Sequence, residues 1–192
     1  MSAICNVSCF NSIIDKVEGL IMTEVKHLTF GSKNAPITIE SFINFACPFC
    51  KNYFKAADHA LTPHIESGEV QHVVKHFDKT KQALLKGTVA NIHLNYDNPE
   101  ETLAIIRQLY DTQDQWKASF ATVEDKMANE FNLTPQKDAD ERSLAINEET
   151  FERGIKGIPT VFINDKKFEF NPLKDEQDKI ESLLNEAISK LK

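Results

Sequence analysis

The feature that most constrains the fold is a β-strand pattern that runs directly into two closely spaced cysteines. Residues 37–43 are rich in β-branched and aromatic side chains, which predicts a strand. The sequence Cys47-Pro48-Phe49-Cys50 follows almost at once. Beyond it, apolar residues recur at helical spacing, at Phe54, Leu61 and Ile65. The chain must therefore place both cysteines at a junction between a strand and a helix.

Thiols at the start of a helix have a definite chemistry. Cys47 would lie where unpaired backbone N–H groups and the helix dipole stabilise a thiolate. Pro48 suits the first turn, because its missing N–H would have no helical partner there. Cys50 lies three residues further on the same helix face, close enough to form a disulfide. We therefore expect Cys47 to be the exposed attacking thiolate and Cys50 the shielded resolving thiol in disulfide exchange.

Two other interpretations of the cysteines remain open. The chain has four, at positions 5, 9, 47 and 50, too few for a scaffold held together by disulfides. Cys5 and Cys9 could join Cys47 and Cys50 in a four-ligand zinc site. Alternatively, the chain could be a redox-inert binding module. The strand-to-helix junction favours redox chemistry, so we expect no metal and no cofactor besides a redox-active Cys47–Cys50 disulfide.

Composition excludes several classes of partner. The 192 residues are 41% hydrophobic and 27% charged, as in soluble globular proteins. The net charge of −7 argues against nucleic-acid binding, and no apolar run is long enough for membrane insertion. The first residues lack a basic cluster, and polar side chains interrupt their apolar stretch, so we expect no secretion signal and a cytoplasmic location. Residues 1–23 are expected to be an N-terminal appendage, and Met22 would also suit the start of the domain.

The rest of the chain predicts further strands around a helical block. Residues 70–77 form a second strand pattern, and 160–163 with 166–170 form a hairpin around Asn164-Asp165. Between them the apolar period is helical, and a helix start is expected at Asn98-Pro99. The expected packing stripes of this block are Leu85, Val89, Ile92 and Tyr96, then Leu103, Ile106 and Tyr110, then Trp116, Phe120, Val123 and Met127. A final helix is expected to pack through Ile180, Leu184, Ala187 and Leu191.

Two segments resemble the DsbA-like branch of the thioredoxin superfamily. They are residues 40–50 (Glu-Ser-Phe-Ile-Asn-Phe-Ala-Cys-Pro-Phe-Cys) and residues 156–164 (Lys-Gly-Ile-Pro-Thr-Val-Phe-Ile-Asn). The resemblance implies an α/β thioredoxin fold with an inserted all-helical subdomain. Its first part would span residues 24–78, the insertion 79–149 and the second part 150–192.

The resemblance also implies roles for individual residues. Pro159 would adopt a cis peptide bond beside the cysteines. Ile158 would offer backbone groups to an extended substrate, with Pro48 and Phe49 also in the substrate-binding surface. Glu40 is the candidate for a proton relay, although a solvent-facing strand carboxylate is an equal alternative. Gln113 and Trp116 lie in another stretch that resembles this family, but no catalytic role is assigned to them.

The implied activity is that of a protein-disulfide oxidoreductase. Its partners would be thiol- or disulfide-containing proteins and a thiol redox partner. Pro-Phe stands between the cysteines where strongly oxidising DsbA enzymes have Pro-His, so the reduced form should be less favoured here. Oxidase, reductase and isomerase directions stay open, and so does the role of Cys5 and Cys9.

Overall fold

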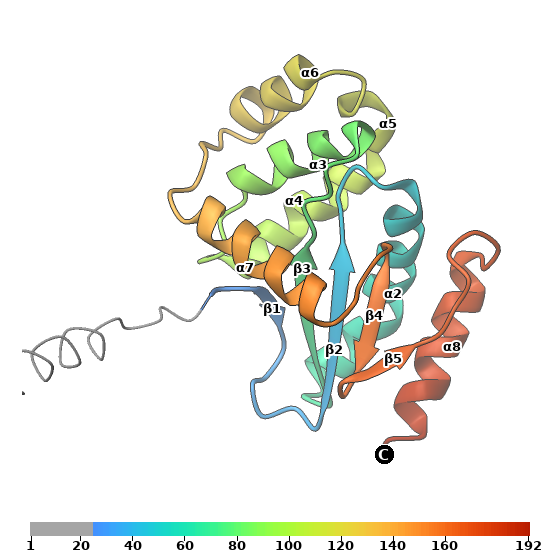
Figure 1. Ribbon diagram of the computed structural model, residues 1–192. Coiled ribbons are helices and arrows are strands. Elements are labelled where there is room, and N and C mark those ends of the chain that lie inside the picture. Colours follow the sequence, from blue (N-terminus) through green and yellow to red (C-terminus); the bar gives the residue numbers. More distant parts are fainter. Residues whose placement is uncertain (1–24) are drawn as a thin grey trace, which may run out of the picture.

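A five-stranded mixed sheet forms the centre of the protein (Figure 1). The structure, a computed structural model, describes residues 25–192. The strands lie in the order β1-β3-β2-β4-β5, and only β2 and β3 are parallel to each other. Their bounds are β1 (Leu28–Phe30), β2 (Ile37–Ile43), β3 (Val70–His76), β4 (Thr160–Ile163) and β5 (Lys166–Phe168). The cysteine motif therefore follows the central strand.

The strands and turns follow the local sequence signals. In β2, Ile37, Ile39 and Ile43 are fully or almost fully buried on one face, as the two-residue period of a strand requires. The β4–β5 hairpin turns at Asn164 and Asp165, both at positive φ (45° and 62°), a conformation that suits a two-residue hairpin turn. These predicted strands are confirmed, whereas β1 was not predicted from its sequence.

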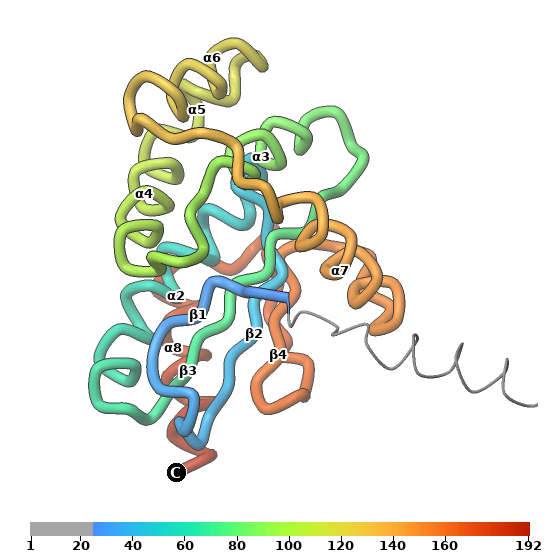
Figure 2. The backbone as a smooth tube through the Cα atoms, turned by 90° about the vertical axis from the view of Figure 1, so that its left-hand side faces the viewer, coloured from blue at the N-terminus to red at the C-terminus, as the bar shows by residue number. Residues whose placement is uncertain are grey.

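Helices α2 (Pro48–Glu66) and α8 (Gln177–Ser189) pack together on one face of the sheet (Figure 2). Pro63 lies inside α2 and does not end it. Gly68 follows the helix at φ 77°, in the left-handed conformation that commonly ends helices. The buried side chains of α8 are Ile180, Leu184 and Ile188.

The segment between β3 and β4 is helical, as expected. It contains α3 (Gln82–His93), α4 (Pro99–Asp111), α5 (Gln113–Trp116), α6 (Phe120–Asp125), the π-helical turn η1 (Lys126–Glu130) and α7 (Ala139–Glu152). Most of it lies beyond the end of β2 that leads to the cysteines, while α7 lies across the face of the sheet opposite α2 (Figures 1 and 2). There Phe42, Ile146 and Ile155 form a second, smaller core.

Two details of this helical block differ from expectation. In α3 the buried positions are Leu84, Gly87, Ala90, Asn91 and His93, not the predicted stripe through Leu85, Val89 and Ile92. Phe120, expected in a packing face, is 43% exposed at the first turn of α6. Among the described residues, no helix combines the length and apolar character needed to cross a bilayer.

Candidate functional site

Cys47 caps the amino end of α2. Its backbone is extended (φ −82°, ψ 122°), Pro48 opens the helix, and the Cys47 carbonyl already accepts the N–H of Lys51 at 3.1 Å. Cys50 lies one turn along on the buried side of the same helix. The predicted junction of strand, cysteine pair and helix is thus confirmed. Phe49, between the cysteines, is 40% exposed.

Cys47 is less accessible than expected. Its exposed fraction is 4%, against 0% for Cys50, so the prediction of an exposed Cys47 is wrong. The side chain lines the wall of a groove of about 580 Å³, which also contains Gly157, Ile158 and residues from the loop before α3. The other walls of this groove come from segments distant in sequence, residues 79–86, Lys117 and residues 157–158. A substrate would therefore reach Cys47 through the groove.

The two free thiols differ in acidity. A hydrogen bond from the Cys50 thiol lowers the pKa of Cys47 to about 7, against the opposing effect of burial. Backbone N–H groups of Phe49 and Cys50 and the charge of Lys81 act in the same direction. Burial raises the pKa of Cys50 well above its usual range, and interaction with Cys47 adds to this. Close to neutral pH, Cys47 is the thiol that ionises.

Asn44 fixes the segment between β2 and the cysteines. Its side-chain oxygen accepts the N–H of Ala46 at 3.0 Å, and its side-chain nitrogen donates to the Phe77 carbonyl at 3.1 Å. Its own carbonyl accepts the N–H of Cys47 at 3.0 Å. Gly87 of α3 packs against this turn so closely that an added Cβ would lie 2.2 Å from the Asn44 oxygen. The glycine therefore allows α3 to cover the approach to Cys47.

Gln113 and His76 hold the same segment from two other elements. The amide nitrogen of Gln113, in α5, donates to the carbonyls of Phe45 (2.7 Å) and Cys47 (3.1 Å). Nε2 of His76, at the end of β3, accepts the N–H of Phe45 at 3.2 Å, and its Nδ1 lies 2.9 Å from Asp78. Sequence reasoning assigned no role to Gln113, Asn44 or His76. The only available signal was that polar residues in and around the motif would need partners if they were buried.

The second predicted segment lies beside the first. The Ile158–Pro159 peptide bond is cis, Pro159 is buried, and Ile158 is half-buried in the wall of the groove that contains Cys47. Pro48 and Phe49 line the same groove. The structure thus brings together the residues predicted for catalysis and substrate binding, with the exception of Glu40.

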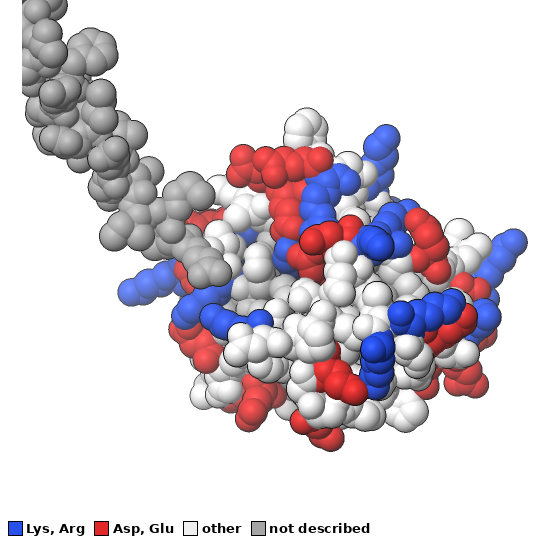
Figure 3. Space-filling view, turned by 90° about the horizontal axis from the view of Figure 1, so that it is seen from below, with Lys and Arg blue, Asp and Glu red and all other residues white. Residues whose placement is uncertain are grey.

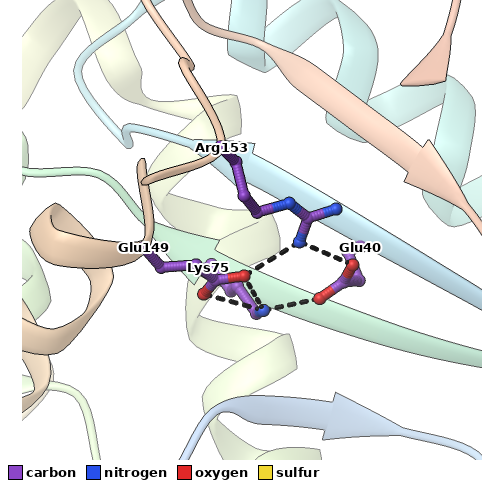
Figure 4. A network of polar contacts seen from close by, with 4 residues as sticks. All are labelled: Glu40, Lys75, Glu149 and Arg153. Carbon is purple, nitrogen blue, oxygen red and sulfur yellow. Dashed lines mark hydrogen bonds and ion pairs between the residues drawn. The ribbon is translucent and has the colours of Figure 1, made fainter. Parts of the chain in front are cut away.

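Glu40 lies in a partly buried ion network on the other face of the sheet (Figure 4). Its carboxylate contacts Lys75 at 2.5 Å and Arg153 at 2.8 Å, and Glu149 of α7 contacts the same two cations. Burial raises the pKa of Glu40, but the hydrogen bonds and charges of Lys75 and Arg153 outweigh it and leave the pKa below its usual value. These contacts fasten α7 to the sheet and give no support to the predicted proton relay.

The zinc alternative depends on residues outside the described part of the chain. Cys5, Cys9 and the predicted appendage at residues 1–23 all fall there. Within residues 25–192, no group of three or more His, Cys, Asp or Glu side chains is placed to hold a metal ion.

Comparison with known proteins identifies the family. Residues 23–185 match the family described as thioredoxin. A conserved protein of unknown function from Enterococcus faecalis V583 is 29% identical, with a TM-score of 0.76 over 85% of this chain and 90% of that one. ScsC from Proteus mirabilis in a compact conformation is 19% identical, with a TM-score of 0.64 over 97% of this chain and 94% of that one.

A third solved structure, alpha-DsbA1 from Wolbachia pipientis, is 18% identical, with a TM-score of 0.60 over 90% of this chain and 98% of that one. At such identities ScsC and alpha-DsbA1 show a shared fold. No curated protein matches the chain significantly. The fold expected from the two sequence segments is confirmed: it is a thioredoxin fold with a helical insertion, shared with ScsC and alpha-DsbA1. The chain belongs to the thioredoxin family.

Proposed function

We propose that this protein exchanges disulfides with protein substrates, with Cys47 as nucleophile and Cys50 as resolving thiol. The observation that carries the proposal is the placement of two free thiols one helical turn apart, Cys47 at the amino end of α2 and Cys50 fully buried behind it, which makes their acidities unequal. The pKa of Cys47 is about 7 and that of Cys50 lies well above the usual range. Only the thiolate attacks a disulfide, so the first step falls to Cys47 near neutral pH.

The exchange takes two balanced steps. The Cys47 thiolate attacks one sulfur of a substrate disulfide, forms a mixed disulfide and releases the other sulfur as a thiolate. Cys50 then gives up its proton and attacks the Cys47 sulfur. This step closes the Cys47–Cys50 disulfide and releases the second substrate thiolate. Two electrons pass from protein to substrate, and the reverse sequence oxidises a substrate dithiol. The cysteine pair is itself the redox group, and a second thiol protein would restore its starting state.

Ile158 supports the engagement of an extended peptide. Within residues 25–192, its backbone N–H and C=O make no hydrogen bond, and the residue shares the groove wall with Cys47. A substrate segment passing through the groove could pair with these groups as an added strand does. Phe49 offers an exposed apolar surface beside the sulfur.

The test compares Cys47→Ser with Cys50→Ser in the full chain, with Cys5 and Cys9 replaced by Ser in every sample so that only the motif reacts. After mixing with a disulfide-bonded protein, non-reducing gels should show Cys50→Ser trapped as a mixed disulfide and Cys47→Ser inert. Redox titration in glutathione buffers should show a two-electron transition only when both cysteines are present. Equal trapping by the two variants would overturn the assigned roles.

A further inference from the structure

The groove beside Cys47 has an unusual charge for this chain. Its lining includes four lysines, Lys79, Lys81, Lys86 and Lys117, and no Asp or Glu. The whole chain carries 29 acidic and 22 basic residues, with a net charge of −7. At the opposite end of the sheet, acidic and basic side chains are interspersed (Figure 3). The positive charge is therefore concentrated at the entrance to the reactive sulfur.

The lysines are held over the groove from different sides. Lys79 donates to the Lys156 carbonyl at 2.5 Å, and the ammonium group of Lys86 lies 5.8 Å from the centre of the Phe120 ring. Neither contact neutralises the charge. Lys117 pairs with Asp114 at 2.7 Å, and the Asp114 side chain is 78% exposed and does not line the groove.

Between the lysines, the lining of the groove is apolar. Phe49 is 40% exposed, and Leu84 and Ile158 line the wall near Cys47. A partner with apolar groups next to its cysteine and carboxylates on either side would match this surface. Concentrated charge of one sign in a cleft raises the local concentration of opposite charge and speeds association.

We propose, on the basis of the proposed function, that the four lysines select protein segments in which Asp or Glu flanks the reacting cysteine. The preference acts on the encounter that precedes formation of the mixed disulfide. It should therefore appear in the second-order rate of the first step and weaken as salt screens the charges.

The test uses three short peptides of equal length, each with one cysteine and each prepared as a disulfide-linked homodimer. The residues that flank the cysteine are Asp, Gln or Lys. The second-order rate with the reduced full-length protein is divided by the rate with 2-mercaptoethanol, which corrects for the reactivity of each peptide. We expect the acidic peptide to react about tenfold faster than the basic one at low salt, and within about twofold of it at roughly 0.5 M salt.

Two pairs of substitutions separate the groove from overall charge. Lys86→Gln with Lys117→Gln removes two groove lysines that are not among the main causes of either cysteine pKa shift. Lys33→Gln with Lys166→Gln removes two exposed lysines outside the groove, with the same change in net charge. The ratio of acidic to neutral peptide rates should fall about threefold or more in the first pair and stay unchanged in the second.

The outcomes distinguish this inference from the proposed function. If no peptide reacts with the wild type, the proposed function itself fails. Equal rates for the three peptides, or equal ratios in both variant pairs, would overturn the acidic preference and leave the exchange activity standing. Glutathione disulfide serves as a small anionic competitor. If it reacts as fast as the acidic peptide, the groove recognises a small anionic disulfide, and the proposed preference for acidic protein segments is wrong.

Discussion

The two faces of β2 differ in their polar contacts: one carries paired ions and the other carries neutral hydrogen-bonded groups. On one face, Glu40 lies between two cations in a partly buried network of four ions. On the other, its neighbour Ser41 joins neutral groups, with its hydroxyl 2.6 Å from the Tyr53 hydroxyl and 2.8 Å from Nε2 of His72. Burial lowers the pKa of His72 to about 4, so the ring is neutral at neutral pH.

The difference shows how one strand can support two kinds of contact. The charged face fastens α7 of the insertion to the sheet through paired ions. The neutral face supports α2, the helix whose amino end stabilises the Cys47 thiolate. Buried ions are tolerated when each has a partner, whereas buried neutral groups need only hydrogen bonds. The two faces should therefore respond to different perturbations.

The largest expected effect comes from breaking the charged face. Lys75→Met leaves Glu40 and Glu149 with Arg153 alone. Lys75 is buried but both carboxylates are partly exposed, so we expect a loss of about 2–3 kcal/mol of unfolding free energy, below the roughly 3–5 kcal/mol of a fully buried pair. Urea denaturation of the wild type and the variant measures this difference in unfolding free energy.

Two further variants control this result. Lys190→Met, whose partner Glu186 is exposed, should cost less than about 0.5 kcal/mol. The double variant Lys75→Met/Glu149→Met, which removes one charge of each sign, should lose less than Lys75→Met alone. A single variant no less stable than Lys190→Met would show that the network does not stabilise the fold.

The next largest effect is expected on the neutral face, where a fall in pH favours protonation of His72 and should lower the free energy of unfolding. Because burial lowers the folded-state pKa of His72 to about 4, the unfolded chain binds a proton below about pH 6.5 while the folded chain does not. The stabilisation from His72 is complete above pH 6.5 and is lost as the pH falls towards 4. From pH 7 to pH 5 the loss should be about 2 kcal/mol. His72→Leu, which cannot titrate, should remove that part of the pH dependence. Parallel curves for the two proteins would contradict the buried neutral histidine.

A smaller effect is expected where neutral hydrogen bonds hold the start of α2. Gln113→Leu leaves the carbonyls of Phe45 and Cys47 without this donor, which should cost about 1–2 kcal/mol. Gln115, exposed on the same short helix, offers the matched control Gln115→Leu, expected to change stability by less than about 0.5 kcal/mol. If both variants lose the same stability, the effect belongs to α5 and not to the hydrogen bonds.

Local signals were sufficient to predict much of this fold from sequence. Three predicted features depend on neighbouring residues alone, and each is present: the strand of β-branched and aromatic residues at 37–43, the helix start at Asn98-Pro99 and the Asn164-Asp165 turn. The cysteine pair was predictable for the same reason, since its setting is a contiguous strand, motif and helix.

The remaining features depend on contacts between distant segments. Leu85, Val89 and Ile92 share a helix face, yet α3 buries the neighbouring face because Gly87 must approach Asn44. The burial of Cys47 results from segments folded around it, which its own flanking residues do not encode. The sequence placed Glu40 on a strand but could not predict its ion-pair partners, because Lys75 and Arg153 are distant in sequence.

The smallest expected effect is that of a Glu40 substitution on the rate of thiol exchange. It tests most directly whether the two faces of β2 are independent. Glu40→Gln removes the carboxylate without changing its shape. A proton relay for Cys50 would have to release and regain a proton near neutral pH, and its loss should slow the resolving step about tenfold or more. Glu40 lies on the face opposite α2, and its lowered pKa makes the carboxylate a poor acceptor for the Cys50 proton at neutral pH.

We therefore expect the alkylation midpoint of Cys47 to stay near pH 7 and the resolving rate to change by less than about twofold. Stopped-flow release of substrate thiol measures the rate, and circular dichroism checks that the variant is folded. A tenfold slower resolving step in a folded Glu40→Gln protein would mean that the charged face communicates with the cysteines, and that the two faces of β2 are not independent. An unchanged rate would assign Glu40 to the attachment of α7, leaving the thiol chemistry to groups on the α2 side of the sheet.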